Sequence, residues 1–92
     1  MDSNQAKQTL RRLAQEGCIV ISNHCREQMK KRNVTTEDIL YVLLWGDIKE
    51  IKKSDITNDW KAEVKGKDLD GDQLTVQAAV SEDERTIIIT VY

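Results

Sequence analysis

The hydrophobic pattern of this chain changes once, from a helical spacing before Gly46 to a strand alternation after it. Ahead of Gly46, apolar side chains recur every three to four positions, as they do on one face of an amphipathic helix. Beyond it, apolar and polar side chains alternate, as they do in strands with one wet face. Because the 92 residues contain no linker, repeat or low-complexity stretch, we expect a single α+β domain over residues 1–92.

Two helices are expected before residue 33. Residues 3–15 carry Ala6, Leu10, Leu13 and Ala14 on one face, and Asp2 or Ser3 can cap their start. A second helix, capped by Ser22 or Asn23, runs to about Arg32. Between the two helices, Cys18–Ile21 is short and β-branched, which fits either a buried strand or an extended connector.

A third helix begins after Thr35, whose hydroxyl can cap the amide of Asp38. It is apolar around most of its circumference, so it is expected to be the central buried helix, with Trp45 in the core. Gly46 ends it, at a position where a left-handed conformation is common.

The second half predicts an antiparallel sheet of about four strands, with the helices packed on one of its faces. Ile48–Ile51 is a weak strand, and the last run, residues 86–92, is apolar enough to be an interior strand covered on both faces. The two middle strands alternate, with wet positions at Lys61, Glu63, Lys65, Thr75, Gln77 and Ala79.

Two turns are expected between these strands. Residues 81–84 have turn chemistry and join the last two strands as a hairpin. Asp70–Gly71 also favours a hairpin, but a strict two-residue loop would place Val64 opposite Gln77 and put the apolar positions out of phase. The register therefore requires an odd loop, or a bulge at Gly66 or Gly71.

Composition excludes several classes of protein. The start, residues 1–5, lacks the features of a signal peptide, and no apolar run approaches the roughly 20 residues of a membrane span, so a soluble cytoplasmic protein is expected. The net charge of −2 divides into +3 for residues 1–53 and −5 for residues 54–92. That asymmetry permits a local anion-binding face.

Neither a metal nor a cofactor is expected. Cys18, His24 and Cys25 supply too few zinc ligands at an unsuitable spacing, and two cysteines make no disulfide framework. The acidic run 68–72 lacks the glycine that a calcium loop has at its sixth position, where Gln73 stands. Serine-triad, phosphate-loop and dinucleotide motifs are absent as well.

His24 and the cations near it are the residues most suited to chemistry. The positive start of a helix and the neighbouring Arg26, Lys30, Lys31 and Arg32 favour a neutral imidazole, which can accept a proton, although a capping or solvent-facing histidine is the simpler reading. Helical spacing places Arg32 with Cys25 and Met29 on the core side, where it requires an anionic or carbonyl partner.

Each of the two aromatic residues in the predicted strands fits two different roles. Trp60 and Tyr92 can pack under a helix or offer a face on which bases stack, and core packing is the favoured role for Trp60.

Ile21–His24, Met29, Arg32–Ile39 and the terminal Ile88–Tyr92 together resemble a small prokaryotic family, domain of unknown function 4258. Asn33 stands where many of its members have glycine, and Asn tolerates the same left-handed backbone. Gln28 stands where many members have arginine. That family is in turn distantly similar to RelE/ParE-like toxins, which implies a RelE-like arrangement of helices on an antiparallel sheet.

The resemblance implies a toxin component of a bacterial toxin–antitoxin pair that acts as a metal-independent endoribonuclease on messenger RNA. The expected catalytic residues are His24, Arg26, Arg32 and Tyr92, with Lys30 and Lys31 contacting nucleic acid. An antitoxin-like protein and RNA are the partners that this reading implies. The alternative is a non-enzymatic module whose sheet edge or basic helix binds another protein.

Overall fold

The computed structural model describes residues 2–55 and 59–92. Its elements, in chain order, are α1 (Ser3–Gln15), β1 (Ile19–Ile21), α2 (Asn23–Arg32), α3 (Thr36–Trp45), β2 (Asp47–Lys53), β3 (Trp60–Lys67), β4 (Gln73–Val80) and β5 (Thr86–Val91). The α+β class and the switch from helices to strands near Gly46 are therefore confirmed.

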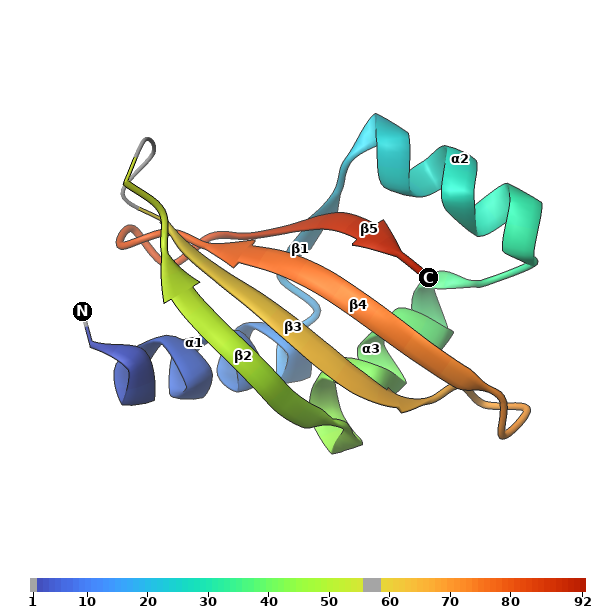
Figure 1. Cartoon of the computed structure of the whole chain (residues 1–92), viewed down its shortest axis with the longest axis horizontal. Coiled ribbons are helices and arrows are strands. Elements are labelled where there is room, and N and C mark those ends of the chain that lie inside the picture. Colours follow the sequence, from blue (N-terminus) through green and yellow to red (C-terminus); the bar gives the residue numbers. More distant parts are fainter. Residues whose placement is uncertain (1, 56–58) are drawn as a thin grey trace.

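The sheet has five strands in the order β1-β5-β4-β3-β2, and it is mixed (Figure 1). The expectation of about four antiparallel strands was wrong because β1 pairs with β5 in parallel, with Val20 beside Ile87. Such a pairing joins residues more than sixty positions apart, so no local turn announces it. It also makes β5 an interior strand, as predicted.

The hydrophobic core lies between one face of the sheet and the helices α1 and α3, which contact each other. Alternate residues of β3 and β4 supply the sheet side of this core: Ala62, Val64, Leu74, Val76, Ala78 and Val80. Helix α2 is placed differently, because it packs against β5 at the edge of the sheet (Figure 1). The expectation of all helices on one face is therefore corrected.

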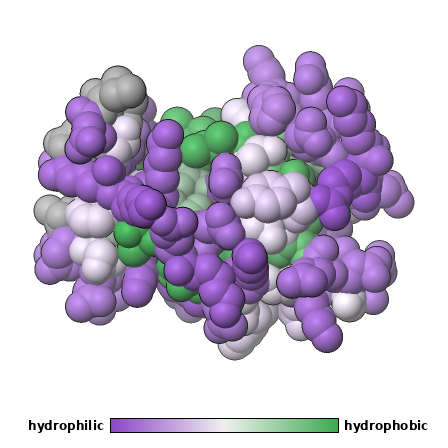
Figure 2. Space-filling model, in the orientation of Figure 1, coloured by the Kyte–Doolittle hydropathy of each residue, from purple (hydrophilic) through white to green (hydrophobic). Residues whose placement is uncertain are grey.

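The opposite face of the sheet, here called the open face, carries neither α1 nor α3. Figure 2 shows it as mostly hydrophilic, with some hydrophobic side chains exposed between the polar ones. Ile87 is 44% exposed there, so the second face of β5 is not covered as predicted.

Local capping accounts for the helix starts. Asp2 and Thr35 each form a reciprocal capping box, and the Ser22 hydroxyl accepts from the amide of Cys25. Asn33 ends α2 with φ 57° and ψ 42°, the left-handed conformation expected of it.

Gly46 ends α3 in extended rather than left-handed backbone, with φ −77° and ψ 173°, which corrects that prediction. Its requirement for glycine is steric. A β-carbon there would lie 2.6 Å from the Val42 carbonyl oxygen and 2.7 Å from that of Lys65. The helix end and β3 therefore meet backbone to backbone.

The third helix is less buried than its composition suggests. Ile39, Val42 and Leu43 are in the core, but Trp45 is 74% exposed, so its predicted core position was wrong. Trp45, the last residue of α3, lies at the surface and lines a hollow with Gly66 and Lys67 of β3. Trp60, in contrast, packs against the core from β3, as favoured.

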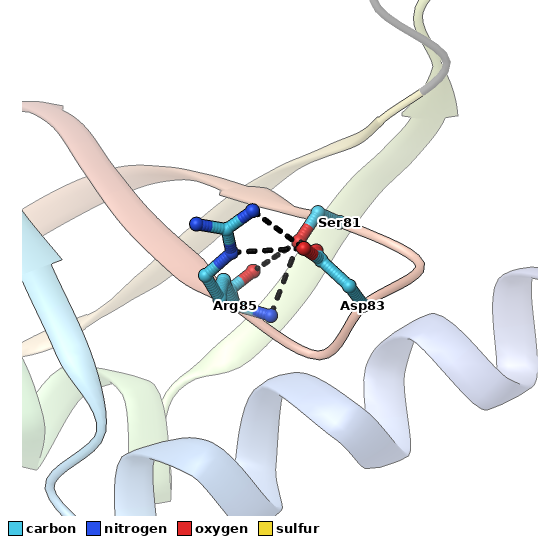
Figure 3. Close-up of polar contacts among 3 residues, drawn as sticks. All are labelled: Ser81, Asp83 and Arg85. Carbon is cyan, nitrogen blue, oxygen red and sulfur yellow. Dashed lines mark hydrogen bonds and ion pairs between the residues drawn. The ribbon is translucent and has the colours of Figure 1, made fainter.

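Both predicted hairpins form. The β3–β4 loop covers residues 68–72, an odd number, so Val64 stands opposite Val76 and the phase is correct. In the β4–β5 turn, the Ser81 hydroxyl bonds to Asp83, and Arg85 Nε donates to Asp83 Oδ2 at 3.0 Å (Figure 3). Arg12 of α1 reaches Glu84 of this turn at 2.9 Å.

Candidate basic helix and open-face cluster

Helix α2 is anchored to β5 at its start. The Ser22 amide donates to the carbonyl of Ile88, and its hydroxyl donates to that of Ile89 at 2.9 Å. Cys25 is the only residue of the helix that is fully buried, so the helix touches the core through its first turns and leaves most of its surface in solvent. Its last turn carries three cations, which suit the negative end of the helix dipole.

Four cations lie close together on α2, and none of them has an acidic partner among the described residues. Within residues 2–55 and 59–92, no ion pair joins Arg26, Lys30, Lys31 or Arg32 to a carboxylate. By contrast, Lys49 lies 3.7 Å from Asp47 and Lys52 lies 2.7 Å from Glu50. With four cations against one acid, Glu27, helix α2 therefore concentrates net positive charge on the surface.

Arg26 and Lys30 share one flank of α2, since residues four apart lie one turn from each other. With Met29, Asn33 and Val34 they line a shallow hollow of about 400 Å³. Two cations and an amide side chain around one hollow are suited to an anion. Lys31 lies on the other flank, about 140° around the axis from Arg26.

The predicted catalytic residues of α2 do not share a face. His24 and Arg26 are both exposed, but they lie about 160° apart around the helix axis, on nearly opposite sides. Arg32 is also exposed, which corrects the expectation that it leans toward the core. Its angular position is the one predicted, but only Cys25 and Met29 of that face contact the core, and Arg32 lies beyond them at the exposed end of the helix.

Tyr92, the fourth predicted residue, lies on the open face in a polar cluster. Its phenol donates to Glu63 Oε2 at 3.2 Å and accepts from Gln77 Nε2 at 3.3 Å. Partial burial raises the pKa of Tyr92, and the bond to Glu63 raises it further. The phenol therefore keeps its proton at neutral pH and can act as a donor.

Glu63 and Gln77 also line a hollow of about 270 Å³, together with Glu50, Lys52, Lys61 and Ile89 among others. Sequence reasoning did not select these residues as functional, although the alternation of β3 and β4 did identify Glu63, Gln77 and Lys61 as wet positions. The hairpin of β4 with β5 was predicted, but its register was not: a shift between Gln77 and Ala78 places Tyr92 opposite Thr75, near these residues.

The two groups of residues are connected through β5. Ser22, at the start of α2, bonds to Ile89, and Tyr92 lies three residues further along the same strand, roughly 10 Å away. Figure 1 shows α2 beside this end of β5 and the C-terminus. The start of the basic helix is thus near the Tyr92 cluster.

The cysteines do not form a metal site with His24. Cys18 is exposed and Cys25 is buried. Burial raises the pKa of the Cys25 thiol, although the charge of Arg26 partly opposes this. No group of three or more potential metal-ligating side chains occurs within the described part of the chain.

The model of one family, described as domain of unknown function DUF4258, matches residues 21–92, which include α2, α3 and the whole sheet except part of β1. The chain belongs to the DUF4258 family. No curated protein and no solved structure matches it. Within the described residues of this DUF4258 chain, no helix is both long enough and apolar enough to cross a membrane.

Proposed function

We propose that this DUF4258 protein binds RNA through α2 and is a toxin-like endoribonuclease of the RelE/ParE kind. The observation that carries the proposal is the set of four cations on α2, none of which forms an ion pair within the described residues. A cluster of cations that no carboxylate holds is available to neutralise phosphates.

Arg26 and Lys30 are the phosphate contacts in this proposal. Their shared hollow with Asn33 supplies a bidentate guanidinium, an ammonium and an amide to one anion. Lys31 contacts a different phosphate, because it lies on the other flank. The chain's net charge of −2 makes such binding local to α2 and weak at high salt.

The chemistry follows from the ribose. The 2′-oxygen attacks the adjacent phosphorus, the bond from phosphorus to the 5′-oxygen breaks, and a proton passes to the departing oxygen. Tyr92 is the proposed donor of that proton, because its phenol is protonated at neutral pH and lies at the C-terminal end of β5, near the start of α2. His24 is the proposed acceptor of the 2′-hydroxyl proton, and Arg32, about 80° from His24 around α2, is the proposed stabiliser of the charge on that phosphate. Arg26 lies on nearly the opposite side of the helix and stabilises the charge of a neighbouring phosphate.

The test is cleavage of a labelled single-stranded RNA by the purified protein, alone and with ribosomes. We expect products that end in a 2′,3′-cyclic phosphate, no cut in the 2′-O-methyl oligonucleotide, and loss of cleavage in Tyr92→Phe. Arg26→Gln with Lys30→Gln should weaken binding, while Lys49→Gln with Lys52→Gln, which removes two paired cations, should not. Intact RNA in both settings, with no harm to cells on expression, would exclude the proposal.

A second candidate is a non-enzymatic protein-interaction module. The separation of His24 from Arg26 around α2 favours it, as does the edge strand β1. Val20 on β1 is 58% exposed beside Ile87, while the other edge, β2, is protected by lysines and a bulge after Ile48. This function predicts a complex with the product of an adjacent gene that persists when His24, Arg26 and Arg32 are all replaced by alanine.

A further inference from the structure

Three of the large exposed apolar side chains gather on the α3 side of the molecule, away from the residues of the proposed function. Trp45 is 74% exposed, Leu69 58% and Tyr41 40%. We call these three residues the α3 patch. Contiguous exposed apolar surface on a small domain commonly marks a contact with another protein.

The fold itself holds the patch in a line. Tyr41 and Trp45 lie one turn apart on α3. The amide of Leu69 donates to Asp38 Oδ1 at 3.0 Å, which fixes Leu69 beside the start of the same helix. At the other end, Gly46 lies against the backbone of Lys65. The patch therefore runs from Trp45 through Tyr41 to Leu69, alongside residues 65–69 of β3 and its loop.

A hollow of about 260 Å³ gives the patch a concave surface. Tyr41 and Trp45 line it together with Gly46, Gly66 and Lys67 among others. A β-carbon at Gly66 would lie 3.0 Å from the Gly46 α-carbon, so the two glycines form a floor without side chains. Such a depression has room for one large side chain of a partner.

The charges around the patch differ between its ends. Lys65 and Lys67 line the hollow at the Trp45 end, where Lys65 lies 3.8 Å from Glu63 and Asp47 is engaged by Lys49 at 3.7 Å, so Lys67 is the cation there without an ion pair among the described residues. Asp70 and Asp72 flank the Leu69 end, and in the described residues neither carboxylate forms an ion pair. When two copies of a surface that is basic at one end and acidic at the other pack in opposite directions, each basic end meets an acidic end.

We infer that the α3 patch is the interface with a second copy of this chain, related by a two-fold axis near Tyr41. In that arrangement, Trp45 of one copy covers Leu69 of the other, and the lysines of each copy face the aspartates of its partner. The same patch serves both copies, as a two-fold interface requires. A polyanion such as RNA is disfavoured here because Asp70 and Asp72 would repel it.

Sedimentation velocity between about 5 and 500 µM tests this inference. The wild-type protein should shift from monomer to dimer with concentration, and Trp45→Glu should weaken dimerisation by at least about 30-fold, as expected for a central tryptophan. Val20→Glu is the matched control, since Val20 is also an exposed apolar residue, and it should dimerise as the wild type does. A wild-type protein that stays monomeric throughout, or a Val20→Glu variant as weak as Trp45→Glu, overturns the inference.

Charge reversal tests the antiparallel arrangement. Lys67→Glu and Asp70→Lys should each weaken the dimer, and the double variant should recover it, because opposite charges again face each other. A double variant weaker than both single variants contradicts the reversed packing. Circular dichroism of each variant verifies folding, and the emission of Trp45 in a Trp60→Phe background should shift to shorter wavelength as the dimer forms.

Discussion

Replacement of Arg26 and Lys30 by glutamine should remove a defined part of the salt dependence of RNA binding. These two cations share one flank of α2 and one hollow, and neither has an acidic partner within the described residues. Glutamine keeps most of the length and polarity of each side chain. The double substitution therefore changes charge more than shape.

The expected magnitude follows from counterion release. Each phosphate that a protein neutralises on a single strand contributes about −0.7 to the slope of log K against log of the salt concentration. Two contacts contribute about −1.4, which is roughly a sevenfold loss of affinity between 50 and 200 mM salt. The double variant should lose this part of the slope, and its affinity should approach that of the wild type as salt increases.

Fluorescence anisotropy of a labelled single-stranded RNA, titrated at four or five salt concentrations, measures the slope directly. The control variant, Lys49→Gln with Lys52→Gln, removes the same charge from the edge strand β2, where both cations are already paired. Its slope should stay within about 0.3 of the wild-type value, since paired surface cations bind few additional anions. If both double variants lower the slope equally, general charge rather than the Arg26–Lys30 hollow binds the RNA, and our reasoning about α2 is refuted.

Three further predictions concern stability. Burial favours a raised pKa for Asp38, but hydrogen bonds from Thr35 and Leu69 outweigh it and lower the pKa below 3.8. The stability that this lowered pKa contributes is present above about pH 4 and is lost as pH falls through the folded pKa. In urea melts at pH 3 to 7, Asp38→Asn should therefore remove this decline in the free energy of unfolding toward acid pH. The control, Asp72→Asn, should keep it. Arg11 donates to the Leu44 carbonyl and to that of Gly46 at 2.7 Å, so Arg11→Ala should cost about 2 kcal/mol in thermal unfolding, against less than about 1 for the exposed Arg12→Ala. Gly46→Ala should cost about 3 kcal/mol by the same measurement, because the new methyl group meets backbone on two sides, and a near-neutral result would contradict that packing.

Local chemistry explains the elements that could be predicted. Each helix start depends on a side chain within three residues of the amide that it caps, as with Ser22 and Cys25 or Thr35 and Asp38. The odd β3–β4 loop could be deduced from parity alone, because an even loop would have exposed half of the apolar residues.

The candidate site was predictable only in part. The basic character of α2 is written in consecutive residues, and the wet face of β3 in its alternation. Tyr92 meets Glu63, however, only because β5 lies beside β4 and β4 beside β3. The turn residues predicted both hairpins, but the register that brings Tyr92 to Glu63 includes a shift between Gln77 and Ala78, which no local pattern encodes.

The sequence by itself determined the class of the fold, the helix starts, the face of each middle strand and the concentration of cations on α2, because propensity, capping and alternation act over a few residues. The tertiary structure decided the parallel pairing of β1 with β5, the edge position of α2 and the exposure of Trp45 and Arg32. Burial is the property that separates the features that the sequence determined from those that the tertiary structure decided. A side chain is buried only if another element covers it, and which element does so depends on the whole topology rather than on the residue's own surroundings in the chain.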